Sequence, residues 1–109
     1  KIGLATSNSM HLLTTTLKSN NAFELFDAIT VTDEVEKSKS NPDIYLLAAK
    51  KLGVNPSECM VFEDIIAAVY GAKLAGMKVT GVYDKHSEHQ IDILKKECDN
   101  YIYNYEDLI

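Results

Sequence analysis

Two adjacent carboxylates, Glu63 and Asp64, interrupt an otherwise apolar stretch of this sequence. The stretch reads CMVFEDIIAAVYG, with strand-like residues before the acids and a helix-like run after them. Because burying a charge is costly unless it is paired or bound to a metal, these acids need a partner. Carboxylate oxygens suit a hard cation such as Mg²⁺. The alternative is an N-cap pair that complements the dipole of the following helix.

Hydroxyl and amino groups stand at two comparable places in the chain. Thr6 ends the strand-like segment KIGLAT, and the polar turn Ser7, Asn8 and Ser9 follows it. Free N–H groups at the start of the next helix favour an anion there, although plain helix capping is the alternative. Lys39 lies just before another helix start, as a phosphate ligand or as a solvated surface lysine. All eleven basic residues are Lys, so no Arg fork is available for a phosphate.

The elements that must position these groups alternate between strands and helices. Apolar or β-branched runs predict strands at 1–6, 28–32, 59–62 and 78–83, with a short last strand in DNYIY. Cap signals and helical periodicity predict helices from 10 to about 20, at 41–53, at 65–76 and at 87–97. This alternation predicts βαβ crossovers and a parallel sheet, whose strands bind ligands at their carboxyl ends.

The segment NPDIYLLAAKKLG carries the clearest helix signals. Asn41 is predicted to cap the helix, Pro42 to occupy its first position and Gly53 to end it. Its buried stripe is predicted to consist of Ile44, Leu47, Ala48 and Leu52.

Gathered at one sheet edge, the groups at the strand ends form a set suited to phosphoryl transfer. Thr6 and Lys39 can bind phosphate oxygens, while the Glu63–Asp64 pair can hold Mg²⁺. Catalysis of this reaction consists mostly of positioning and charge stabilisation. An attacking group is missing from the set.

Composition limits the possible partners. The chain has 109 residues, 46% of them hydrophobic and 25% charged, as in one soluble globular domain. A net charge of −5 argues against nucleic acid, and no apolar run approaches the ~20 residues that cross a membrane. Cys59 opens an apolar strand and is predicted to be a buried thiol in a reducing compartment, which favours a cytoplasmic location.

The order and spacing of these groups resemble the haloacid dehalogenase superfamily, specifically its β-phosphoglucomutase-like phosphatases. GLATSNS resembles the family's second motif with Thr6, and SKSNPDIYL its third with Lys39. VFEDIIAAVYGAKLAGM resembles the fourth motif with Glu63 and Asp64, so the likeness covers nearly the whole chain. There are local departures, since Ser replaces the usual Gly and Pro on either side of the lysine and Ile65 replaces a frequent Ser.

The resemblance implies an α/β fold, a Rossmannoid parallel sheet with helices on both faces, and makes residues 1–109 the C-terminal part of its core domain. The family's first motif, an Asp-x-Asp pair that supplies the nucleophile and the general acid/base, does not occur in these 109 residues. In the family, its strand lies between those matched by KIGLAT and CMVF. We therefore expect a fragment with an incomplete sheet and no cap domain. Its gap would be filled by the missing N-terminal half of the same protein or by a strand-donating chain.

For the intact protein, the resemblance implies Mg²⁺-dependent phosphomonoester hydrolysis through a phospho-aspartate, on a small phosphorylated metabolite such as a sugar phosphate. Asp64, with Glu63 directly or through water, would help to hold Mg²⁺, and Lys39 would offset charge on the nucleophile and the phosphoryl group. The phosphoryl oxygens would be bound by Thr6 and by two further groups, the backbone N–H of Ser7 and the side chain of Asn8. The chain alone is expected to be inactive.

Three alternatives remain beside the phosphatase. A sugar-phosphate mutase would use the same intermediate, and a non-catalytic interaction fragment would have kept the fold without the chemistry. A receiver-type signalling domain also uses acids, Thr and Lys around Mg²⁺. Its acidic pair precedes the Thr and Lys, however, whereas here the pair comes last.

Overall fold

The computed structural model describes residues 1–7 and 9–108, in which five strands alternate with helices. The strands are β1 (Gly3–Thr6), β2 (Ala28–Val31), β3 (Met60–Glu63), β4 (Lys78–Val82) and β5 (Asn100–Ile102). The α-helices are α1 (Met10–Ser19), α2 (Asp43–Leu52), α3 (Ile66–Leu74) and α4 (Ile91–Glu97). Among the described residues, none of the helices is both long enough and apolar enough to cross a membrane.

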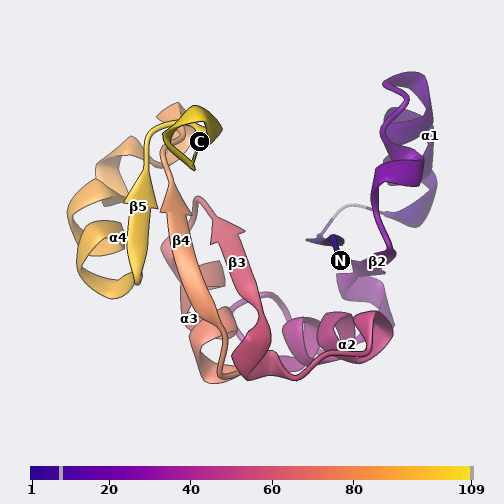
Figure 1. Cartoon of the computed structure of the whole chain (residues 1–109), viewed down its shortest axis with the longest axis horizontal. Helices are drawn as coiled ribbons and strands as arrows, with labels where there is room; N and C mark the ends of the chain where they lie inside the picture. The colour runs from indigo at the N-terminus through magenta and orange to yellow at the C-terminus, as the bar shows by residue number, and fades with distance from the viewer. Residues whose placement is uncertain (8, 109) are drawn as a thin grey trace.

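The strands form two parallel sheets. β1 pairs with β2, with Thr6 opposite Val31, and the second sheet has the order β3-β4-β5, with Glu63 opposite Gly81. Figure 1 shows the two sheets as the arms of a V, with α2 at its base. The parallel α/β architecture and the expected half-sheets are both confirmed.

A groove of about 860 Å³ lies between the half-sheets. Residues of β1, β3 and α2 line it together, among them Leu4, Ala5, Tyr45, Ala48 and Met60. Because α2 faces this groove, the predicted apolar stripe is only partly covered.

The buried face of α2 differs from the predicted stripe. Ile44 is fully buried as predicted, but Leu47, Ala48 and Leu52 are only half-buried. Tyr45 and Ala49 are buried instead. The buried face of α2 is therefore centred closer to Tyr45 and Ala49 than the predicted stripe, and Ala48 and Leu52 line the groove.

The helix caps follow the predictions except at the start of α2. Ser9 caps α1 by accepting the Leu12 N–H, and Gly53 ends α2 with φ 70°. The Asn41 cap is wrong, because Pro42 occupies the N-cap position and the Asn41 side chain donates to the Ser40 hydroxyl at 3.4 Å.

Several other boundaries differ by a few residues from the predictions. The predicted helix at 87–97 is a 3₁₀ segment, Lys85–Gln90, followed by α4, because Ser87 has non-helical angles (φ −113°, ψ 16°). Cys59 precedes β3 and is half-buried rather than buried, since it lines the groove. Glu63 belongs to β3 as its last residue.

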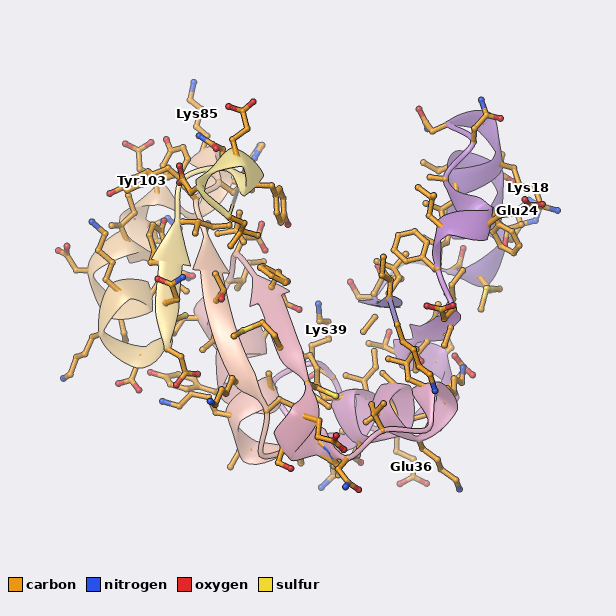
Figure 2. All side chains as sticks on the ribbon, in the orientation of Figure 1. Lys18, Glu24, Glu36, Lys39, Lys85 and Tyr103 are labelled. Atoms are coloured by element: carbon orange, nitrogen blue, oxygen red, sulfur yellow. The ribbon has the colours of Figure 1, made fainter. Side chains whose placement is uncertain are left out.

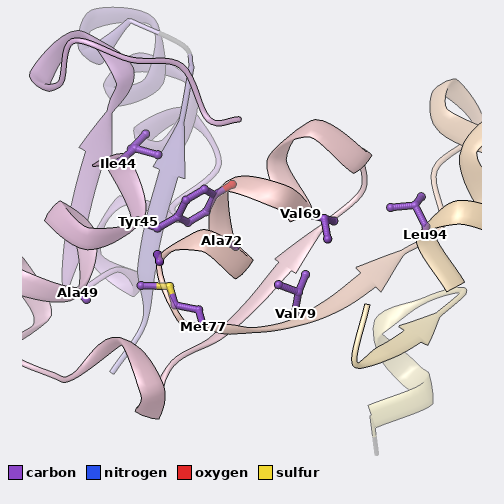
Figure 3. Close-up of a cluster of buried hydrophobic side chains, with 9 residues drawn as sticks. Ile44, Tyr45, Ala49, Val69, Ala72, Met77, Val79 and Leu94 are labelled. Carbon is purple, nitrogen blue, oxygen red and sulfur yellow. The ribbon is translucent and has the colours of Figure 1, made fainter. Parts of the chain in front are cut away.

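The core joins the half-sheets through their helices. Its buried side chains come from α2, α3, α4 and the β4 region, including Ile44, Val69, Val79 and Leu94 (Figure 3). At Gly71 the backbone of α3 approaches the backbone of the loop before α2. A Cβ at this position would lie 1.9 Å from the Lys39 carbonyl oxygen and 2.8 Å from that of Asn41.

Gly71→Ala is therefore expected to destabilise the protein by about 1–3 kcal/mol, because the added methyl group overpacks against backbone. The sign is diagnostic, since Ala in an unconstrained helix interior stabilises by about 1 kcal/mol relative to Gly. Urea unfolding measures the effect, with Leu74→Ala at an exposed position of α3 as the control. A Gly71→Ala variant more stable than the unmodified protein would contradict the close approach.

Candidate functional site

Four of the predicted site residues, Ser7, Lys39, Glu63 and Asp64, line a pocket of about 720 Å³ at the carboxyl ends of the strands. Ser7 follows β1, Thr32 and Asp33 follow β2, and Glu63 and Asp64 lie at the end of β3. Lys39 joins them from the loop before α2, and Figure 2 shows it in the space between the two arms. Residues from both half-sheets thus share one pocket.

The hydroxyl-rich turn is placed in part. Ser7 is exposed and lines the pocket. Thr6 is half-buried at the end of β1, next to Ser7 and opposite Val31, outside the lining that the described residues form. Asn8 lies outside the described residues, so its predicted role stays a prediction.

A buried carboxylate organises the pocket wall. Glu63 is 9% exposed, and its Oε1 forms an ion pair with Lys39 Nζ. The same oxygen accepts a hydrogen bond of 3.0 Å from the Tyr45 hydroxyl. Since an unpaired buried carboxylate would be strongly destabilising, these two donors explain how the charge is accommodated.

Lys39 is a partly buried, ion-paired lysine rather than a solvated surface lysine. Its side chain is 22% exposed, and besides the ion pair its Nζ donates to the Ala5 carbonyl of β1 at 3.5 Å. The lysine therefore contacts β1 and β3, which belong to different half-sheets.

Tyr45 is held as a hydrogen-bond donor. Burial is the main cause that raises its pKa well above the usual range, and the charge and hydrogen bond of Glu63 raise it further. The phenol consequently keeps its proton, and the Glu63 carboxylate keeps this donor, at all ordinary pH values.

Neither acid occupies the N-cap position of α3. α3 begins at Ile66, with Ile65 in the N-cap position. The Ile66 N–H, one of the free N–H groups at the start of this helix, donates to Gln90 Oε1 at 3.0 Å. Asp64 is instead half-buried in the pocket wall.

The chemistry of the donors fits a hard cation, but the set is small. Glu63 and Asp64 offer carboxylate oxygens, and the exposed Asp33 and Glu36 line the same pocket. Within residues 1–7 and 9–108, no group of three or more His, Cys, Asp or Glu side chains is arranged to share a metal ion. These residues can therefore supply part of a coordination shell for Mg²⁺.

Sequence reasoning missed Tyr45 and Asp33. Asp33 lies two residues after the end of β2, so the rule that selected the other strand ends would have found it. Tyr45 lies four residues before the buried Ala49 on α2, a spacing that places both on one face of the helix. The sequence pattern indicates only that the ring of Tyr45 is buried, not that its hydroxyl donates to Glu63.

Parallel sheets with a lysine, carboxylates and a serine near the carboxyl ends of their strands place this chain among the α/β proteins that bind ligands at that edge. The comparisons identify the family within this class, since the model for haloacid dehalogenase-like hydrolases matches residues 1–82. The chain belongs to this family of enzymes, and the resemblance seen in its motifs is confirmed.

Individual relatives include phosphatases and sugar-phosphate-binding proteins. The chain is 47% identical to YhcW of Bacillus subtilis (strain 168) over 85 residues, 78% of this chain and 39% of YhcW. It is 42% identical to the fructose-1-phosphate phosphatase YqaB of Escherichia coli (strain K12) over 57 residues, 52% of this chain and 30% of YqaB.

The structural comparison agrees. A structure of CbbY from Rhodobacter sphaeroides in complex with xylulose-(1,5)bisphosphate matches with a TM-score of 0.88 at 26% identity. The match covers 99% of this chain and 48% of that one. The chain thus spans less than half the length of each of these three relatives.

Lys39→Met is expected to destabilise the protein by about 1–3 kcal/mol, because Glu63 remains buried without its cation. Adding Glu63→Gln should recover part of this loss, since the double variant removes the unpaired charge. Urea unfolding of the single and double variants measures both effects.

Lys51→Met provides the matched control. It removes the ion pair with Glu34, whose two side chains are 30% and 33% exposed, and should change stability by no more than about 1 kcal/mol. If both lysine variants lost the same free energy of unfolding, the Lys39–Glu63 pair would contribute no more to stability than the exposed Lys51–Glu34 pair.

Proposed function

We propose that these residues belong to an Mg²⁺-dependent phosphomonoester hydrolase that acts through a phospho-aspartate. Residues 1–109 would be the C-terminal part of its core domain. The observation that carries the proposal is the Lys39–Glu63 ion pair beside Asp64, in a pocket at the carboxyl ends of the strands. Family membership adds support, because enzymes of phosphate-ester chemistry are among the relatives.

Each side chain has a distinct task in this proposal. Asp64, with Glu63 directly or through water, would hold Mg²⁺, which when bound offsets negative charge on the phosphoryl group. Lys39 adds a positive charge on the same side of the pocket. Thr6, the Ser7 N–H and Asn8 would donate to phosphoryl oxygens at the end of β1.

The nucleophile must come from outside these residues. The 109-residue sequence contains no Asp-x-Asp pair, and the groove between β1 and β3 separates the two half-sheets. We propose that a strand carrying the nucleophile fills this groove, supplied by the N-terminal half of the same protein. The exposed Met60 and Phe62 of β3 support this, since large apolar side chains on an open strand edge favour pairing with another segment.

The substrate is proposed to be a small phosphorylated metabolite, with sugar phosphates as the first class to test. Support comes from the named substrate of YqaB and from the ligand of the CbbY structure. Measuring released inorganic phosphate separates hydrolysis from the mutase alternative, which would convert one sugar phosphate into its isomer without net release. A cytoplasmic location remains part of the proposal.

In the full-length protein, Asp64→Ala should lower Mg²⁺-dependent hydrolysis of p-nitrophenyl phosphate by at least about 100-fold, because a charge-stabilising group is lost. Steady-state release of p-nitrophenol with and without Mg²⁺ measures the effect. Asp92→Ala, at an exposed position of α4, is the control and should retain activity. Unchanged turnover in Asp64→Ala would remove the metal assignment.

Residues 1–109 alone should show no turnover under conditions in which the full-length protein is active, because the nucleophile is absent. Light scattering should also detect association of the isolated chain through its open strand edges. Hydrolysis by residues 1–109 at the full-length rate would refute the proposed phospho-aspartate on another segment.

A further inference from the structure

Tyr45 is a buried tyrosine whose hydroxyl contacts a residue of the pocket wall. It is 2% exposed on α2, a helix that packs against β1 and β2. Figure 3 shows its ring projecting from α2 toward α3. Its hydroxyl reaches Glu63 at the end of β3, so one hydrogen bond connects the two half-sheets.

The three side chains of the pocket wall contact one another in pairs. Glu63 Oε1 accepts from the Tyr45 hydroxyl at 3.0 Å and pairs with Lys39 Nζ. Lys39 Nζ also lies 6.0 Å from the centre of the Tyr45 ring, within the range of a cation–π contact. Tyr45 therefore restricts the orientation of the Glu63 carboxylate directly, through its hydrogen bond. It restricts the Lys39 ammonium group through Glu63 and through the contact with its own ring.

A phenyl ring would fill the same space without this donor. A hydrogen bond to a buried charged group is stronger than one between neutral groups, and it also limits the rotation of the carboxylate. The charged partner of the Tyr45 hydroxyl is Glu63, a proposed site residue, so the hydroxyl has a role beyond packing.

We propose that Tyr45 is a positioning residue: its hydroxyl orients the Glu63 carboxylate and, through it, the Lys39 ammonium group in the phosphoryl-transfer pocket. This inference rests on the proposed function and deepens it.

The test compares Tyr45→Phe with the unmodified full-length protein. Removing a hydrogen-bonding partner that orients a site ligand lowers metal affinity or activity by roughly tenfold or more. We expect kcat for p-nitrophenyl phosphate to fall by about 10-fold and KM to change less than about twofold. Mn²⁺ affinity, measured by electron paramagnetic resonance without substrate, should weaken by about 10-fold.

Tyr83→Phe is the matched control, because it removes a Tyr–Glu hydrogen bond of 3.2 Å to the exposed Glu88, outside the pocket. It should leave kcat and Mn²⁺ affinity within about twofold of the unmodified protein. In a Glu63→Gln background, Tyr45→Phe should have a much smaller further effect, since the hydroxyl acts through Glu63.

The outcomes separate the two proposals. If the unmodified protein neither hydrolyses the ester nor binds Mn²⁺, the proposed function fails and the role of Tyr45 fails with it. If the unmodified protein does both and Tyr45→Phe loses only stability, the proposed function stands and Tyr45 is a packing residue. Equal effects of Tyr45→Phe with Glu63 and with Gln at position 63 would also overturn the inference.

Discussion

A single carboxylate oxygen, Glu63 Oε1, is the meeting point on which the arrangement of the pocket depends. Lys39 and Tyr45 both bind it, one from the loop before α2 and one from the helix itself. Both donors are covalently tied to the half of the fold that packs on β1 and β2, whereas Glu63 ends β3. The need to pair a buried negative charge therefore also fixes how the halves approach each other at this edge.

The same region shows how a backbone contact can support a charged group. Gly71 lets α3 approach the carbonyl groups of Lys39 and Asn41 closely, which holds the loop beside the site. Apolar packing between α2 and α3 lies next to this contact, with Ile44, Val69 and Ala72 all fully buried. The loop that carries Lys39 thus lies against the buried core formed by α2 and α3.

The groove between β1 and β3 is the place that we propose for a strand carrying the nucleophile. It separates two parallel sheets whose carboxyl ends already carry groups suited to a phosphoryl ligand. Ala48 and Leu52 of α2 line this groove. They were predicted to be buried but are only half-buried. The proposed strand would cover this face of the helix and would bring the proposed nucleophile to the pocket.

Local sequence determined the kinds of elements, the Ser9 and Gly53 caps, and the placement of Lys39, Glu63 and Asp64 near strand ends or helix starts. These features depend on neighbouring residues and on helical or strand periodicity, which are visible along the chain. Tertiary structure alone decided that Lys39 pairs with Glu63, that Tyr45 donates to the same oxygen, and that Gly71 must lack a side chain. The Tyr45–Glu63 contact joins residues 18 positions apart on different elements, and no local pattern encodes which buried groups the packing of helices and sheets will bring together.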